Sequence, residues 1–286
     1  MNKVKTNKFY NKKLLMYKIL KKIIPNYFKK IIIKEVDKNY LFSGWGMKSR
    51  SCPPWQYVHY KKEETYLSYF NNIQKELEKK ITSSKFISNQ FPINTLAKIK
   101  EFKWRHYTVC MTIKFLSKYK KKITLVEAGT ADGFTAWFAL KASKKEKLKI
   151  NKFYLYDSWQ PMKKKYLYSD EFRQIGRYGN NNYEDTKKNF KSFKNIKFMK
   201  GFIPQILNNK NSPKSVDWLH IDLNSAKPTL EVLNFFDKKL TNNSIILFDD
   251  YGSANHETAR RKIDLWCKKR NGILFALATG QAIYFV

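Results

Sequence analysis

Three acidic side chains stand at the ends of two apolar runs in the last third of the chain. The run VDWLHID (216–222) stops at Asp222, and the run SIILFDD (244–250) stops at Asp249 and Asp250. Strands of an open α/β sheet present their functional residues at their carboxyl ends, so we expect these carboxylates to meet at one edge. Crowded carboxylates repel one another unless a cation compensates them, and their oxygens suit Mg²⁺. The alternative is that Asp222 supports a bound ligand and the other two cap a loop.

A glycine-bearing turn follows another apolar run, at residues 123–128. It reads Glu127-x-Gly129-x-x-x-Gly133 and leads into a helix pattern. Glycine lets the backbone approach a ligand closely, and the amide groups at a helix N-terminus attract a carboxylate. The spacing is neither that of a P-loop nor that of a dinucleotide fingerprint. An ordinary strand–turn–helix connection is therefore the competing interpretation.

Asp157 ends the next apolar run, KFYLYD (152–157). A carboxylate at the end of the second strand can accept hydrogen bonds from both hydroxyls of a ribose. Taken alone, an aspartate here is more typical of a turn or a helix cap. Its position after the glycine turn favours the ribose.

His256 lies shortly after the Asp249–Asp250 pair and is followed by Glu257. A histidine titrates near neutral pH and could act as a general base. It could equally face solvent in the first turn of a helix.

Other basic and aromatic residues near these runs are weaker candidates. His220 lies within a strand pattern and is expected to be packed, whereas Lys227 is close enough to Asp222 to orient a substrate. Trp104, Arg105 and His106 lie on a helix pattern ahead of the sheet. They either line the ligand site or belong to the core.

The elements that position these residues alternate between helix and strand patterns. Helix patterns cover 62–81, 95–120, 182–193, 227–240 and 256–270, with a short helical turn at 202–207; strand patterns cover 123–128, 152–157, 196–201, 216–222, 244–250 and two runs within 272–286. This alternation predicts a mostly parallel sheet with crossover helices. The last two strands are joined by the short turn ATGQ, so they must be antiparallel.

The charge of the chain is extreme. Its 57 basic and 23 acidic residues give a formal net charge of +34 over 286 residues. Such a charge suits a nucleic acid or an anionic membrane surface. The alternative is that lysine is simply the usual surface residue here, because only 7 of the basic residues are arginine and the charge is spread along the whole chain. Either way the surface should attract anionic substrates.

The first 94 residues differ from the rest, and we expect a domain boundary between 94 and 95. Residues 1–40 alternate lysine with apolar side chains. This pattern predicts a basic helix that lies on anionic lipid, a helix that packs on the following domain, or a loose tail. Lysine interrupts every apolar run, so we expect neither a secretory leader nor a spanning helix. We therefore expect a cytoplasmic protein, peripheral at the inner membrane face if the lipid contact is real.

The cysteines indicate no metal or disulfide framework. Cys52, Cys110 and Cys267 are far apart, odd in number and form no CxxC pair. This arrangement fits a reducing compartment.

From about residue 95 to 286 the chain resembles a class I S-adenosylmethionine-dependent methyltransferase. More narrowly, it is similar to the macrocin O-methyltransferase family. The segments that carry the resemblance are FKWRHYTVC, VEAGTADGFTA, FYLYDSW, KGFIPQIL, WLHIDLNSAKPTLEVLNFF, ILFDDYGSANHETARRKID and ATGQAIYF. Their order and spacing fit along the whole domain.

The resemblance implies a Rossmann-like seven-stranded sheet in the order 3-2-1-4-5-7-6, with the last strand reversed and helices on both faces. It also implies roles for residues at the cofactor site: Glu127, Gly129 and Gly133 for the methionine end of S-adenosylmethionine, Asp157 for its ribose, and Gly201 and Phe202 for its adenine. Asp222, Asp249 and Asp250 match the Mg²⁺ positions of the metal-dependent members. The chain departs from the family at two places. It has Asn224 where the family tends to carry a second acid, and DSWQPM after the second strand also differs from the family's motif.

The activity that follows is methyl transfer to an oxygen of a sugar or another small hydroxylated acceptor. Asp222 would act through a bound cation, and His256 or a carboxylate would take the proton. The first rival is an RNA methyltransferase; nucleic acid is disfavoured because neither an Asn/Asp-Pro-Pro-Tyr motif nor an RNA-binding module is present. The second is a catalytically inactive scaffold at a membrane surface. The sequence leaves the oligomeric state open.

Overall fold

The computed structural model describes residues 66–253, 256–277 and 279–286. The expectations for residues 1–65, including the basic helix and its contact with anionic lipid, lie outside the described residues. Of the helices within the described ranges, none combines the length and the apolar character needed to span a membrane.

Seven strands form one sheet in the order β3-β2-β1-β4-β5-β7-β6, which confirms the predicted order. Their bounds are β1 (Lys122–Ala128), β2 (Lys149–Asp157), β3 (Ile196–Lys200), β4 (Val216–Ile221), β5 (Leu240–Phe248), β6 (Ile273–Ala276) and β7 (Ala282–Phe285). Strands β1 to β5 pair in parallel, and β7 runs antiparallel to both β5 and β6. The reversed strand is therefore the last one, as expected.

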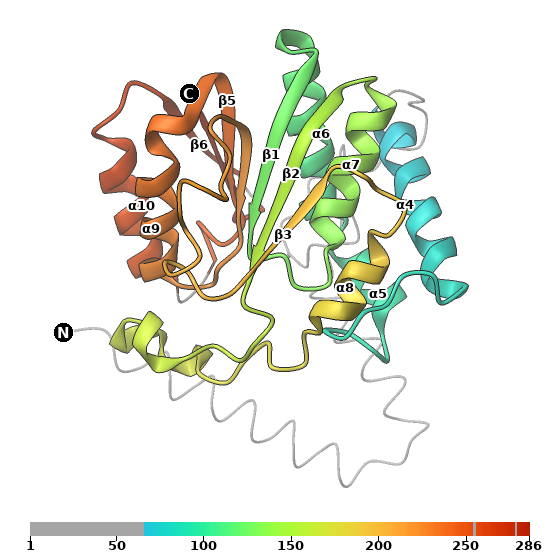
Figure 1. The fold of residues 1–286 in the computed structure, drawn as a ribbon, viewed down its shortest axis with the longest axis horizontal. Coiled ribbons are helices and arrows are strands. Elements are labelled where there is room, and N and C mark those ends of the chain that lie inside the picture. The colour runs from blue at the N-terminus through green and yellow to red at the C-terminus, as the bar shows by residue number, and fades with distance from the viewer. Residues whose placement is uncertain (1–65, 254–255, 278) are drawn as a thin grey trace, which may run out of the picture. The chain divides into compact units, whose positions relative to one another are not determined.

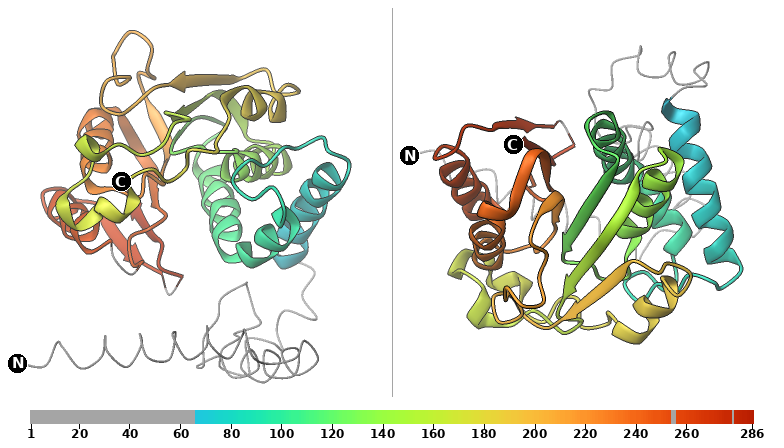
Figure 2. Two further views of the ribbon diagram at one scale, coloured as in Figure 1. Left: turned by 90° about the horizontal axis from the view of Figure 1, so that it is seen from below. Right: turned by 45° about the horizontal axis from the view of Figure 1, so that its top comes forward.

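Helices cover both faces of the sheet, with α4, α6 and α7 on one side and α9 and α10 on the other (Figures 1 and 2). The helix bounds are α4 (Tyr66–Thr82), α5 (Thr95–Glu101), α6 (Lys103–Tyr119), α7 (Phe134–Lys145), α8 (Tyr183–Asn189), α9 (Ala226–Phe236) and α10 (Glu257–Cys267). The described ranges also contain three short 3₁₀ helices: η1 (Lys164–Tyr166), η2 (Ser169–Gln174) and η3 (Asp237–Lys239).

The central strands β1 and β4 are buried along nearly their whole length because both of their faces are covered. Successive side chains of a strand point to opposite faces. Accordingly Leu125 and Trp218 belong to the core on the α6–α7 side, whereas their neighbours Val126 and Leu219 belong to the core on the α9–α10 side. Burial on both faces is what produced the unbroken apolar runs of the sequence.

Three local expectations differ from the structure. The helix expected over 95–120 is divided into α5 and α6 at Phe102, and residues 202–207 form turns instead of a helical turn. In addition α4 begins well before the boundary expected at 94/95, and its buried residues Phe70 and Leu77 join the core on the α6–α7 side. Their apolar side chains leave solvent only by packing on this domain.

Candidate active site

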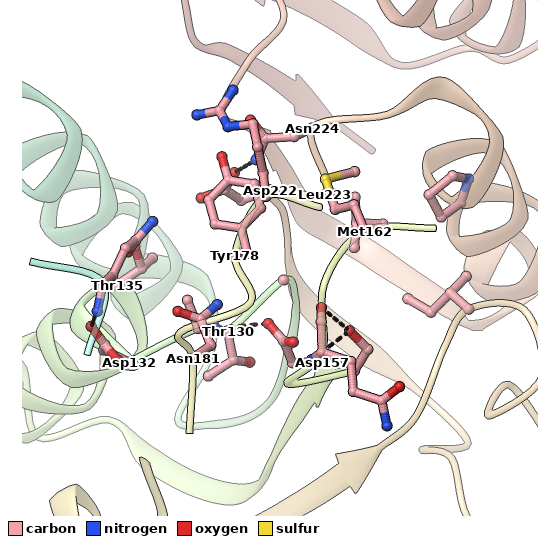
Figure 3. A pocket seen from close by; sticks show the side chains of 18 of the residues that line it. Thr130, Asp132, Thr135, Asp157, Met162, Tyr178, Asn181, Asp222, Leu223 and Asn224 are labelled. Atoms are coloured by element: carbon pink, nitrogen blue, oxygen red, sulfur yellow. Dashed lines mark hydrogen bonds between the residues drawn. The ribbon is translucent and has the colours of Figure 1, made fainter. Parts of the chain in front are cut away.

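A cavity of about 380 Å³ lies at the carboxyl ends of β1, β2 and β4. This volume is in the range typical of small-molecule sites. Its walls come from the loop before α5, the start of α6, the β1–α7 turn, the residues after β2, β3 and β4, and Asp250 after β5. Figure 3 shows Asp157 on one side of the cavity and Asp222, Asn224 and Tyr178 on another.

The glycine turn is shaped by contacts within the protein. Gly129 has φ +92°, and a Cβ there would lie 1.9 Å from the backbone oxygen of Asp222, which leaves room for no other residue. Gly133 has φ +86°, and a Cβ there would meet the ring of Phe190 at 2.3 Å. Gly129 lines the cavity, but Gly133 does not. The glycines let the turn pass close to β4 and α8, so that the backbone of 129–132 forms a cavity wall.

Asp157, at the end of β2, lies beside the backbone of 129–132 and also lines the cavity. Its Oδ2 accepts a hydrogen bond from the amide of Ala131 at 2.8 Å, and its Oδ1 accepts one from the amide of Trp159 at 2.6 Å. Burial raises the pKa of Asp157, and these amide bonds oppose the rise. Each carboxylate oxygen keeps a further lone pair, so Asp157 can still accept two hydroxyl groups from the cavity.

Asp132 connects the glycine turn to a loop that the sequence did not assign to the site. It accepts hydrogen bonds from the amides of Asn89 and Gln90 and from the hydroxyl of Ser88. Gln90 and Phe91 consequently line the cavity. No local motif marked this contact, because Asp132 meets residues more than forty positions earlier in the chain.

Glu127 lies behind the cavity and is not among the residues that line it. It is 1% exposed and lies 3.1 Å from Nδ1 of His220. Burial opposes protonation of His220, but hydrogen bonds and charges from Asp249 and Glu127 outweigh it and raise the pKa of His220 to about 9. Burial raises the pKa of Glu127, against the contact with His220. The two side chains therefore form a buried polar pair beneath the site, and His220 is packed, as expected.

Gly201 and Phe202, which follow β3, both line the cavity. The ring of Phe202 stacks on Tyr166, with centroids 4.8 Å apart and planes 16° apart. Lys163 lies over the same ring at 4.4 Å. Tyr166 and Phe202 therefore form an aromatic part of the wall at this end of the cavity.

Asp222, Asp249 and Asp250 come together at the sheet edge, with carboxylate oxygens within 4.8 Å of one another. The sequence did not assign Arg105 to this cluster, but Arg105 is the partner of two of its carboxylates. Nε of Arg105 donates to Oδ1 of Asp249 at 2.8 Å, and Nη2 donates to Oδ2 of Asp222 at 3.0 Å and to Oδ2 of Asp249. Arg105 thus binds two of the three carboxylates from the first turn of α6.

The surroundings of the three acids shift their pKa values in different directions. Although burial alone would raise the pKa of Asp249, Arg105 and His220 hold it below its usual range. Burial raises the pKa of Asp222 and raises that of Asp250 well above its usual range, in each case against Arg105. Asn224, at the position where relatives carry an acid, donates to Oδ1 of Asp222 at 3.0 Å.

His256 lies beside the acidic residues but not in the cavity wall. Its Nδ1 is 4.0 Å from Oδ2 of Asp250, and its Nε2 is 3.4 Å from the amide nitrogen of Gln174. Burial, followed by the charge of Arg173, lowers the pKa of His256, so the ring is neutral near neutral pH. It is a buried residue at the start of α10, which differs from the solvent-facing alternative.

The weaker candidates from the sequence differ in whether they line the cavity. His106 stacks on Phe138, with centroids 4.3 Å apart, and belongs to the core. Trp104 contacts the edge of the Phe102 ring. Lys227 lies over Tyr168 and lines a neighbouring groove instead of the cavity. Of these residues and Arg105, only Arg105 reaches the cavity.

The segment 158–182, between β2 and α8, covers the carboxyl ends of the strands (Figure 1). It places Arg177 and Tyr178 in the cavity wall, and Tyr178 has a φ of +64°, which is uncommon for a residue with a side chain. Buried Glu171 ties the segment down by accepting hydrogen bonds from the amide of Ala226 at 2.7 Å and the hydroxyl of Ser225 at 3.0 Å. Sequence reasoning missed these wall residues; the Gly/Asn-rich run at 179–182 was the available signal.

Comparisons with known proteins agree with this geometry. Residues 126–251 match the family model described as a methyltransferase domain. The O-methyltransferase NovP has 13% identity and a TM-score of 0.61, over 77% of this chain and 98% of that one. The calicheamicin methyltransferase CalS11 has 12% identity and a TM-score of 0.54, over 87% of this chain and 96% of that one. No curated protein matches this chain.

Residues 126–251 are therefore a methyltransferase domain, and the chain has the fold of the class I S-adenosylmethionine-dependent methyltransferases, which it resembles. Within that class it resembles the macrocin-type O-methyltransferases.

Proposed function

We propose that this enzyme methylates an oxygen of a small hydroxylated acceptor, foremost a sugar hydroxyl. The observation that carries the proposal is that one cavity joins Asp157 to the carboxylates of Asp222 and Asp250. A hydroxyl-binding group and a cluster of proton acceptors therefore face the same space. The description of NovP as an O-methyltransferase supports the choice of oxygen.

The cofactor side of the cavity suits S-adenosylmethionine, whose sulfonium makes its methyl group transferable when bound. Asp157 accepts the two ribose hydroxyls with its remaining lone pairs. Gly201 and Phe202 flank the adenine, and the backbone of 129–132 faces the methionine part. We assign no direct contact to Glu127, which supports the turn from behind through His220.

The acidic side suits the acceptor. The acceptor oxygen lies between the methyl group and the carboxylates of Asp222 and Asp250, which line the cavity. As the new O–C bond forms and the S–C bond breaks, one of these carboxylates takes the hydroxyl proton. His256 is assigned no direct proton transfer, because its Nδ1 is 4.0 Å from Oδ2 of Asp250, beyond hydrogen-bond distance.

The resemblance also implies Mg²⁺ on the three acids, and their arrangement fits such an ion poorly. Both oxygens of Asp249 and one oxygen of Asp222 already accept hydrogen bonds from Arg105. The proton transfer above is therefore assigned to the chain's own side chains.

The test combines binding with turnover. Calorimetry with S-adenosylhomocysteine should show one site, and labelled S-adenosylmethionine should methylate a member of a panel of nucleotide sugars, glycosides and phenols. Asp250→Asn should lower turnover by about 100-fold or more, the usual contribution of a general base, with cofactor affinity little changed. Asp237→Asn is the control, because Asp237 pairs with Arg270 outside the cavity. Absence of cofactor binding, or full turnover in Asp250→Asn, would contradict the proposal.

A further inference from the structure

The guanidinium of Arg105 occupies the centre of the acidic cluster. Three of its N–H groups point at Asp249 and Asp222. The side chain is 21% exposed and lines the cavity, and its Cζ lies over the ring of Phe102 at 5.5 Å. A planar guanidinium matches a carboxylate through two parallel bonds, so this position is held by geometry as well as by charge.

The carboxylate oxygens of Asp222 and Asp249 that a divalent cation would use already accept hydrogen bonds from the protein. Oδ1 of Asp249 accepts from Arg105 and also from Nε2 of Gln281 at 3.0 Å, and Oδ2 accepts from Arg105. Oδ1 of Asp222 accepts from Asn224, and Oδ2 accepts from Arg105. A metal at this cluster would therefore share the oxygens of Asp222 and Asp249 with the guanidinium of Arg105.

The charges at the cluster also disfavour a divalent cation. Arg105 adds a permanent positive charge in direct contact with Asp222 and Asp249. A doubly charged ion among the same oxygens would lie against the guanidinium in a partly buried site, where like charges repel strongly.

We propose that Arg105, and not a divalent cation, is the resident positive charge of the acceptor site. This inference rests on the proposed methyl transfer. Among the described residues, none accepts a hydrogen bond from Nη1 of Arg105, so its N–H groups can turn to the acceptor oxygen. There Arg105 stabilises the negative charge that develops on the oxygen as its proton moves to Asp222 or Asp250.

The test measures metal binding directly. The full chain is stripped with EDTA and titrated with Mn²⁺, with free ion followed by electron paramagnetic resonance. We expect no saturable Mn²⁺ site in the wild type. Arg105→Gln should bind Mn²⁺ at least about tenfold more tightly than the wild type, because it frees the carboxylates and removes the competing charge. Mn²⁺ should also raise the melting temperature of Arg105→Gln, and adding Asp249→Asn should abolish that rise.

Arg270→Gln is the matched control. Arg270 also makes two bonds to one carboxylate, with Nε and Nη2 each 2.6 Å from Asp237, but outside the cavity. This variant should gain no Mn²⁺ affinity. If Arg105→Gln does not fold, Arg105→Lys replaces it; because Arg105→Lys keeps the charge, it should bind no more Mn²⁺ than the wild type.

The inference is overturned if the wild type binds Mn²⁺ as tightly as Arg105→Gln, or if it binds Mn²⁺ at a saturable site that Asp249→Asn abolishes. Calorimetry with S-adenosylhomocysteine on the same samples separates the two proposals. Loss of that binding refutes the methyl-transfer proposal, whereas intact cofactor binding together with a wild-type Mn²⁺ site refutes only the role of Arg105.

Discussion

The two halves of the cavity are built by different means. On the cofactor side, at the ends of β1 and β2, the wall is mainly backbone, fixed by the positive φ of Gly129 and by amides that bind Asp157. On the acceptor side, at the ends of β4 and β5, the wall is a set of charged side chains joined through Arg105. The first half tolerates few changes of shape, whereas the second depends on a balance of charge.

The largest expected effect comes from adding one carbon to the backbone wall. Gly129→Ala should lower the free energy of unfolding by more than about 3 kcal/mol, because a strained φ is combined with a clash against a backbone atom. Urea unfolding of Gly176→Ala is the control, because Gly176 also has a positive φ, +78°, but no described atom lies within 4 Å of the added carbon. Gly176→Ala should lower the free energy of unfolding by only about 1–2 kcal/mol. Equal losses in the two variants would show that the shape of the wall is unimportant.

A smaller effect is expected from the charge on the cofactor side. Asp157→Asn should weaken S-adenosylhomocysteine binding by about 100-fold, since each hydrogen bond to a charged group contributes about 1.5–3 kcal/mol. Asp250→Asn, on the acceptor side, should leave that affinity nearly unchanged when measured by the same calorimetry. The reverse pattern would place the cofactor on the other side of the cavity.

The smallest expected effect concerns the boundary between the halves, where His106 is adjacent to Arg105. Burial, followed by the charge of Arg105, lowers the pKa of His106 from its ordinary value of 6.5 to about 3. The unfolded chain therefore binds a proton below pH 6.5 that the folded chain refuses until about pH 3. This contribution to stability is complete above pH 6.5 and falls by up to about 1.4 kcal/mol per pH unit on acidification.

Urea unfolding at pH 7.5 and 5.5 measures this effect as a difference between the wild type and His106→Phe, which keeps a ring against Phe138. The variant should lose less stability over that range, by about 1 kcal/mol. An identical pH dependence in the two proteins would show that His106 is protonated in the fold.

The sheet was predictable because strands buried on both faces leave continuous apolar runs, and its acids were predictable because they end those runs. Gly129 and Asp157 were predictable for the same reason, because each stands at the end of an apolar run. Arg105 was visible as a candidate, but its role was not, since its partner Asp249 lies 144 residues later in the chain. The same holds for Gln90, which reaches the cavity through Asp132, and for Tyr178, which lies in a segment without a periodic pattern. Contacts of this range follow from the assembled fold alone.

The segment 158–182 closes on itself. The amide of Met162 donates to the carbonyl of Arg177 at 3.0 Å, and the amide of Gly176 donates back to the carbonyl of Met162 at 2.9 Å. The loop between Met162 and Gly176 therefore starts and ends at neighbouring positions. Exchanging it for a loop of another length should alter neither the sheet nor the glycine turn. Lys163 and Tyr166 pack on Phe202 at the adenine end of the cavity, so they must be kept. New acceptor preferences can therefore be introduced by replacing residues 167–175, with the cofactor site left unchanged.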